Sequence, residues 1–152
     1  MNIYCIGAPQ TGKTTWAREW LKNIGADATN TAAYDRDNEW DAMKLNSHDE
    51  LISLLMRTTY KNGIFEDATY LMYSRSKEMC ELLSMARGHL HHNIIICSHS
   101  LQLFPTICLP FLDGIYYTEV FDKDENQRGI LSKLTENYKY YSRADLRQPK
   151  IK

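Results

Sequence analysis

Two glycines, a lysine and a threonine stand at fixed spacing near the start of the chain, in the run GAPQTGKT at 7–14. The apolar residues 3–6 precede this run and a helical pattern over 14–22 follows it, which predicts a strand, a loop and a helix in succession. In such a loop the glycines let successive backbone N–H groups point inward, where they and the start of the helix attract phosphate groups.

The side chains of this loop suit a nucleoside triphosphate. Lys13 can reach the β- and γ-phosphates, and the Thr14 hydroxyl can join the ligands of a Mg²⁺ ion. A glycine-rich turn without a ligand is the alternative. We expect ATP and Mg²⁺ to bind here, through Gly7, Ala8, Pro9, Gln10, Thr11, Gly12, Lys13, Thr14 and Thr15.

Glu66 and Asp67 follow the apolar step 64–65 and are candidates for the carboxylates that hydrolysis of a bound triphosphate needs. One would lie near the metal ion and the other near the attacking water if their strand neighbours the first strand. We assign Glu66, together with Thr14, to the metal ion and favour Asp67 as the base, although the reverse assignment stays open. The alternative is structural, because two acids at the start of a helix are stabilised by the helix dipole.

His99 comes shortly after the β-branched run 93–97, which has the composition of a strand buried on both faces. Ligands of open α/β sheets lie at the carboxyl ends of the strands, so His99 could contact the γ-phosphate or the attacking water. An ordinary hydrogen-bonded polar residue explains the same position equally well.

Strand and helix patterns alternate along the chain, which predicts an α/β fold with a mainly parallel sheet. Asn62-Gly63 predicts a turn ahead of 64–65. Trp16 and Trp20, four residues apart, predict the helix face that packs on the sheet. The expected strands are 2–6, 31–34, 64–65, 93–97 and 114–121, and the expected helices are 14–22, 49–59 (capped by Ser47) and 70–87, with an irregular connection over 101–112.

Size and composition limit what else the chain can do. Its 152 residues fit one domain with a full core. A content of 43% apolar and 24% charged residues is ordinary for a soluble globular protein, and a net charge of −1 excludes a polycation, so any nucleic-acid contact must be local. Apolar runs such as 94–97 are far below the roughly 18 residues of a membrane span. We expect no span, signal peptide or anchor, and a cytoplasmic location.

The four cysteines are far apart in the sequence and form no CxxC pair. Cys5 and Cys97 fall inside apolar runs, where cysteine acts as a small hydrophobic residue. With Cys80 and Cys108 equally isolated, we expect a reducing environment and neither a disulfide nor a zinc site.

Three histidines, His89, His91 and His92, form a local cluster. No cysteine or carboxylate stands beside them at a metal-ligand spacing. We therefore expect them at a solvated helix end.

The stretch 123–152 is expected to add a helix near 126–138 and a basic, aromatic tail to a core at 1–122. Lysines, arginines and tyrosines in 139–152 could bind nucleic acid through phosphates and stacked bases. Flexible termini have this composition more often.

Five segments in order resemble those of one family: GAPQTGKTT (7–15), YDRDNEW (34–40), IFEDATYL (64–71), NIIICSHSLQLFP (93–105) and IYYTEVFD (115–122). With Arg87 ahead of the fourth segment, the set resembles the FtsK/HerA superfamily of pumping ATPases, and it is most similar to the small viral genome-packaging ATPases of that group. Many unrelated NTPases share the first segment, so the blocks EDAT and SHSLQLFP carry the discrimination.

The resemblance implies a three-layer P-loop NTPase fold of the RecA/FtsK type. It implies ATP hydrolysis that moves double-stranded DNA through a ring of subunits, usually a hexamer, to package a viral genome. The implied partners are DNA, further copies of the chain, and capsid or portal-vertex proteins, in the host cytoplasm or with the virion.

Carried over residue by residue, the resemblance implies that Lys13 and Thr14 bind phosphate and Mg²⁺. Glu66 and Asp67 become the second acidic motif, in the reverse order of many relatives, and His99 takes a polar sensor position. A ring ATPase also needs a cation from the neighbouring subunit. Arg87 is the first choice because it precedes the sensor strand, with Arg57 and Arg75 as alternatives; for each, a solvated helix face is the competing explanation.

Two other classes of function stay open. A small-molecule kinase acting on nucleosides or nucleotides shares the loop, but such enzymes usually close an arginine-rich lid, and 79–113 contains only Arg87. A nucleotide-gated phage assembly factor is the third class. Stimulation of ATP turnover by duplex DNA would separate the motor from both.

Overall fold

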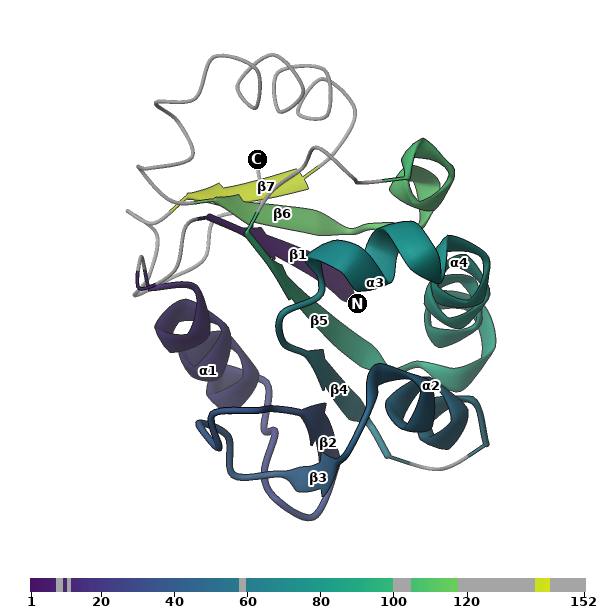
Figure 1. Ribbon diagram of the computed structural model, residues 1–152. Helices are drawn as coiled ribbons and strands as arrows, with labels where there is room; N and C mark the ends of the chain where they lie inside the picture. Colours follow the sequence, from purple (N-terminus) through teal and green to yellow (C-terminus); the bar gives the residue numbers. More distant parts are fainter. Residues whose placement is uncertain (8–9, 11, 58–59, 100–104, 118–138, 143–152) are drawn as a thin grey trace.

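The computed structural model describes residues 1–7, 10, 12–57, 60–99, 105–117 and 139–142, which form an α/β fold around a parallel sheet (Figure 1). Within these residues the strand order is β3-β2-β4-β5-β1-β6-β7, and every neighbouring pair is parallel. The carboxyl ends of the strands therefore share one edge. The strands are β1 (Asn2–Ile6), β2 (Thr31–Tyr34), β3 (Met43–Leu45), β4 (Asn62–Phe65), β5 (Asn93–Ser98), β6 (Gly114–Tyr117) and β7 (Lys139–Ser142).

Helix α1 (Lys13–Asn23) packs on one face of the sheet (Figure 1). Trp16 and Trp20 are buried against residues of the central strands, as their spacing predicted. The Trp16 ring stacks on Tyr116 of β6 with ring centroids 4.4 Å apart. This packing holds α1 against the sheet, with its first residues close to the carboxyl end of β1.

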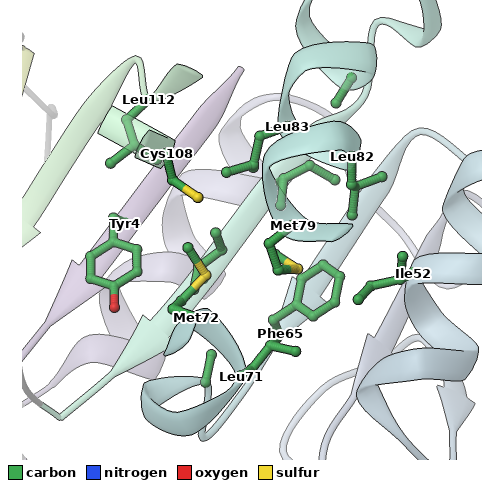
Figure 2. Packing of buried hydrophobic residues seen from close by; sticks show 14 of the residues in the cluster. Tyr4, Ile52, Phe65, Leu71, Met72, Met79, Leu82, Leu83, Cys108 and Leu112 are labelled. Carbon is green, nitrogen blue, oxygen red and sulfur yellow. The ribbon is translucent and has the colours of Figure 1, made fainter. Parts of the chain in front are cut away.

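The opposite face is covered by α2 (His48–Arg57), α3 (Thr69–Ser74) and α4 (Ser76–Met85), so the fold has three layers (Figure 1). Figure 2 shows Phe65 of β4, Met72 of α3 and Met79 of α4 in the core on this side, and all three are fully buried. Ser47 caps α2 as predicted, because its Oγ accepts a hydrogen bond from the Glu50 N–H at 3.1 Å.

The predicted turn at Asn62-Gly63 is wrong, because both residues belong to β4. Gly63 lies beneath α2, where an added Cβ would come within 3.2 Å of Ile94 Cδ1 and closer still to Leu55 Cδ1. The glycine is there for close helix packing and not for a turn.

The predicted helix over 70–87 is interrupted. It divides at Arg75, whose φ of −122° and ψ of 34° are not helical, into α3 and α4. The π-helical turn η1 (Ala86–Leu90) then follows. Neither glycine nor proline marks the break in the sequence, and the apolar pattern continues across it. The pattern therefore predicted one continuous helix.

Two strands were not predicted. β3 is short and mostly exposed, and its pattern of apolar residues is too brief to detect. β7 pairs with β6, so the expectation of a flexible tail is wrong at Lys139–Ser142. The strand expected at 114–121 is described as far as Tyr117, and the helix expected near 126–138 lies outside the described residues.

The expectation of unpaired cysteines is wrong for Cys80 and Cys108, which form a disulfide. Cys80 on α4 packs against the 3₁₀ segment η2 (Thr106–Phe111), which brings the two Cα atoms to 5.2 Å, within the range a disulfide spans. Sequence spacing could not show this contact. Cys5 and Cys97 are free and buried, as expected.

One histidine of the predicted solvated cluster is buried. His92 is 1% exposed and its Nε2 lies 2.9 Å from the Leu55 carbonyl oxygen, whereas His89 and His91 are exposed. Among the described residues, no group of three or more His, Cys, Asp or Glu side chains is placed to hold a metal ion. Every helix in the described part of the chain is too short or too polar to cross a bilayer.

Candidate functional site

The loop between β1 and α1 lies at the carboxyl edge of the sheet. The Gly7 N–H donates to the Ser98 carbonyl oxygen at 3.2 Å, which ties the loop to β5. Gly12 has a φ of 95°, a conformation that favours glycine, and its carbonyl oxygen accepts the first hydrogen bond of α1 from Trp16. The predicted phosphate contacts Ala8, Pro9 and Thr11 lie outside the described residues.

Lys13 is turned inward at this loop. It is 7% exposed, and its Nζ lies 2.6 Å from the Gly7 carbonyl oxygen and 3.4 Å from His99 Nδ1. Burial lowers the pKa of the ammonium, while nearby acidic groups, Glu66 among them, act in the opposite direction. Because burial removes hydration, a bound anion would stabilise this charge strongly.

Glu66 extends directly from β4 toward the same point. Its Oε1 accepts hydrogen bonds from the Trp40 indole N–H at 2.9 Å and from the Thr14 hydroxyl at 3.3 Å. Burial raises the pKa of this carboxyl group, and the two donors partly offset that effect. Glu66 is thus a half-buried carboxylate held beside the first residues of α1.

Asp67 turns the chain out of the sheet. Its φ of 49° lies in the left-handed region, which Asp tolerates better than most residues, and the turn lets the Ala68 N–H donate to the Cys97 carbonyl oxygen at 2.8 Å. Its carboxylate is more exposed than that of Glu66 and lies 3.3 Å from His99 Nε2. The two acids therefore have different environments.

His99 bridges Lys13 and Asp67. Its backbone N–H donates to the Thr69 hydroxyl at 3.0 Å, which orients the residue after β5. With Nδ1 facing the Lys13 ammonium, the hydrogen-bond pattern assigns the ring proton to Nε2, which then donates to Asp67.

The route by which the acids reach the loop differs from the one expected. β4 does not neighbour β1, because β5 lies between them. Both acids still meet the loop, since all strands run in the same direction and end at one edge. The structure thus brings together Lys13, Thr14, Glu66, Asp67 and His99.

These side chains surround a cavity of about 490 Å³. Two further carboxylates, Asp37 and Glu39, reach it from the loop after β2, and sequence reasoning had not chosen them. The sequence feature that could have identified them is the run of acidic residues that follows the strand 31–34. The cavity is lined by Gln10, Gly12, Lys13, Thr14, Thr15, Asp37, Glu39, Glu66, Asp67 and His99.

The oxygen atoms present fit Mg²⁺ carried by a nucleotide. The Thr14 hydroxyl and the Glu66 carboxylate are hard oxygen ligands 3.3 Å apart at the mouth of the loop. Mg²⁺ in such sites takes one or two protein oxygens and completes its shell with phosphates and water. A ready-made cluster of three acidic ligands is therefore not required.

The candidate arginines lie elsewhere. Arg87 donates to the Pro110 carbonyl oxygen at 2.8 Å and pairs with Asp113 at 3.5 Å. Asp113 in turn accepts from the backbone N–H of Asn2, so Arg87 lies at the amino ends of the strands, opposite the cavity of its own chain. Arg75 pairs with Asp49 at 3.1 Å, and Arg57 lies at the end of α2.

Comparisons of this chain with protein-family models, with curated proteins and with solved structures found no match. The site therefore rests on its own geometry.

Proposed function

We propose that the chain is a P-loop ATPase of the FtsK/HerA type that hydrolyses ATP to move double-stranded DNA, and that it serves the packaging of a viral genome. The observation that supports this most is the contact between Thr14 and Glu66 beside the buried Lys13, because a triphosphate site needs a cation, a hydroxyl and a carboxylate at one point.

In this proposal the phosphates occupy the cavity with Lys13 at the β- and γ-phosphates. Thr14 and Glu66 would hold Mg²⁺, which when bound neutralises charge on the phosphates. Asp67 accepts a proton from the attacking water, whose oxygen bonds to the γ-phosphorus as the bond to the β–γ bridging oxygen breaks and ADP leaves. Asp67 suits this role better than Glu66 because its carboxylate is more exposed, whereas the Glu66 carboxylate already accepts hydrogen bonds from Trp40 and Thr14.

The test is ATP turnover by the purified chain with and without duplex DNA. We expect DNA to raise the rate, and Lys13→Ala to lower it by about a hundredfold or more, the size of effect seen when an electrostatic contact to the transition state is removed. Lys22→Ala, at the far end of α1 and exposed, is the matched control and should keep the rate. Equal rates with and without DNA would contradict the motor.

The ring and its trans arginine are tested by oligomeric state. The proposal expects assembly when nucleotide and DNA are both present, with Arg87→Ala lowering turnover without weakening ATP binding. Mixing Lys13→Ala subunits with Arg87→Ala subunits should restore part of the activity, because some interfaces then contain both residues. No recovery on mixing would argue against Arg87 as the residue supplied in trans.

A small-molecule kinase is the second candidate. A second cavity borders Asp67, which would give a phosphoryl acceptor access to the same carboxylate. Transfer of phosphate to nucleosides without stimulation by DNA would favour this candidate over the motor.

A further inference from the structure

The second cavity has a volume of about 420 Å³, within the range typical of small-molecule sites. Asp67 lines it and also lines the cavity at the Gly7–Thr14 loop. The start of α2 forms one wall and α3 forms the other, with Tyr70 and Arg75 on the α3 side. We call it the Tyr70 cavity. Anything bound in it would lie next to the candidate catalytic carboxylate.

Two aromatic rings line the Tyr70 cavity opposite α3. Tyr34 and His48 pack with ring centroids 4.1 Å apart, and His48 Nε2 lies 2.7 Å from the Glu66 carbonyl oxygen. Burial lowers the pKa of His48, which favours the neutral ring and hence a proton on Nε2 that is donated to that carbonyl. These two rings are therefore uncharged, and His48 is connected to the backbone of Glu66.

Tyr70 adds an exposed ring on the opposite wall. It is 74% exposed, and it stands three residues after Asp67. Aromatic faces of this kind stack on planar groups, and nucleobases are planar groups that stack on aromatic side chains without regard to sequence.

Charge restricts the ligand further. Arg75 is held by both carboxylate oxygens of Asp49, at 3.1 and 3.4 Å, so its charge is already balanced. The Asp67 carboxylate is then not balanced by a cation of the lining, so the cavity carries a net negative charge. This charge disfavours a polyanion such as a second triphosphate. Carboxylates accept hydrogen bonds from hydroxyl groups, so an uncharged ligand with hydroxyls is favoured.

We propose that the Tyr70 cavity binds a nucleoside unit, with the base against Tyr70 and a sugar hydroxyl toward Asp67. The unit is either a free nucleoside or the terminal nucleoside of a nucleic acid strand, since both present the same base and hydroxyl. This site goes beyond the proposed function, because binding there does not require that the chain hydrolyse ATP or move DNA.

The experiment is calorimetric titration of the full chain with a non-hydrolysable ATP analogue and Mg²⁺ already bound, so that the first cavity is filled. The probes are adenosine, thymidine and a short single-stranded oligonucleotide with a free 5′-hydroxyl. Tyr70→Ala is expected to weaken binding about tenfold, the loss typical of one base–aromatic stack. Tyr73→Ala is the matched control, because Tyr73 is 65% exposed on the same helix and does not line the cavity.

The outcomes separate the two proposals. Failure of the ATP analogue to bind counts against the proposed ATPase, and the nucleoside titrations still decide the Tyr70 cavity. Binding of a free nucleoside or of the oligonucleotide, weakened by Tyr70→Ala alone, supports the cavity and identifies the source. The proposal is overturned if none of the probes binds, if Tyr70→Ala binds like the unmodified chain, or if Tyr73→Ala loses as much affinity.

Discussion

Trp40 contacts three residues from different parts of the chain, one of them in the candidate site, through separate atoms. Its indole N–H donates to Glu66, and its backbone N–H donates to the buried Asp35 carboxylate at 2.8 Å. The Arg18 guanidinium of α1 lies over its ring, 5.7 Å from the centroid. A tryptophan is needed here because tyrosine and phenylalanine offer no donor at that point on the ring. The orientation of Glu66 therefore depends on the loop after β2 as well as on Thr14.

Replacing Trp40 by phenylalanine is expected to destabilise the protein by about 1–3 kcal/mol, because the half-buried Glu66 carboxylate loses a hydrogen-bond donor. Urea unfolding measures this. Trp20→Phe is the control, since Trp20 is 6% exposed and packs in the same core, whereas the hydrogen-bond donors to Glu66 are Trp40 and Thr14.

A double-mutant cycle isolates the Trp40–Glu66 hydrogen bond from the change in ring size. In a Glu66→Ala background, Trp40→Phe should cost much less than in the unmodified chain. Equal costs in the two backgrounds would show that the indole stabilises the protein by packing alone.

At the scale of elements, the contact of α2 with β4 depends on the lack of a side chain at Gly63. Gly63→Ala is expected to cost about 1–3 kcal/mol, because the new methyl group must displace Leu55 and Ile94 in a packed core. Gly88→Ala is the matched control: nothing lies within 4 Å of its added Cβ, so it should be neutral or slightly stabilising. Denaturation midpoints of the two variants would be compared, and equal stability would contradict the packing argument.

The same glycine shows what the sequence could and could not predict about the elements. β1, α1, β2 and β5 follow from apolar runs and spacing, because their burial is set by residues close in sequence. Gly63 was interpreted as part of a turn, because the contact that requires a glycine there is with Leu55, on another element. The pairing of β7 with β6 and the disulfide likewise depend on contacts between distant segments.

The candidate site was easier to predict than the elements around it. Lys13, Glu66 and His99 meet because each comes shortly after the carboxyl end of a parallel strand, and that rule needs no knowledge of strand order. The insertion of β5 between β1 and β4 left this outcome unchanged. Trp40 was missed because its role depends on the path of the loop after β2, which no local pattern encodes.

At the scale of the whole molecule, one covalent bond joins two neighbouring parts of the fold. The Cys80–Cys108 disulfide connects α4 with η2, the segment that leads into β6, across a sequence separation of 28 residues. The closed loop contains β5 and His99, so the bond restricts the unfolded chain over a region that supplies part of the site. The candidate site itself lies at the strand ends and makes no contact with either sulfur among the described residues.

Loss of this disulfide is therefore expected to lower stability without dismantling the site. Chain-entropy arguments for a loop of this length give a cost of about 3–4 kcal/mol. Urea unfolding of the oxidised chain with and without reductant measures the loss, and Cys108→Ser should unfold like the reduced chain and stay insensitive to reductant. Binding of the ATP analogue to the folded, reduced chain should keep its affinity, because Lys13, Thr14 and Glu66 are held by β1, α1 and β4. Unfolding curves that coincide with and without reductant would show that the two thiols are not bonded in solution, and α4 would then be held against η2 by packing alone.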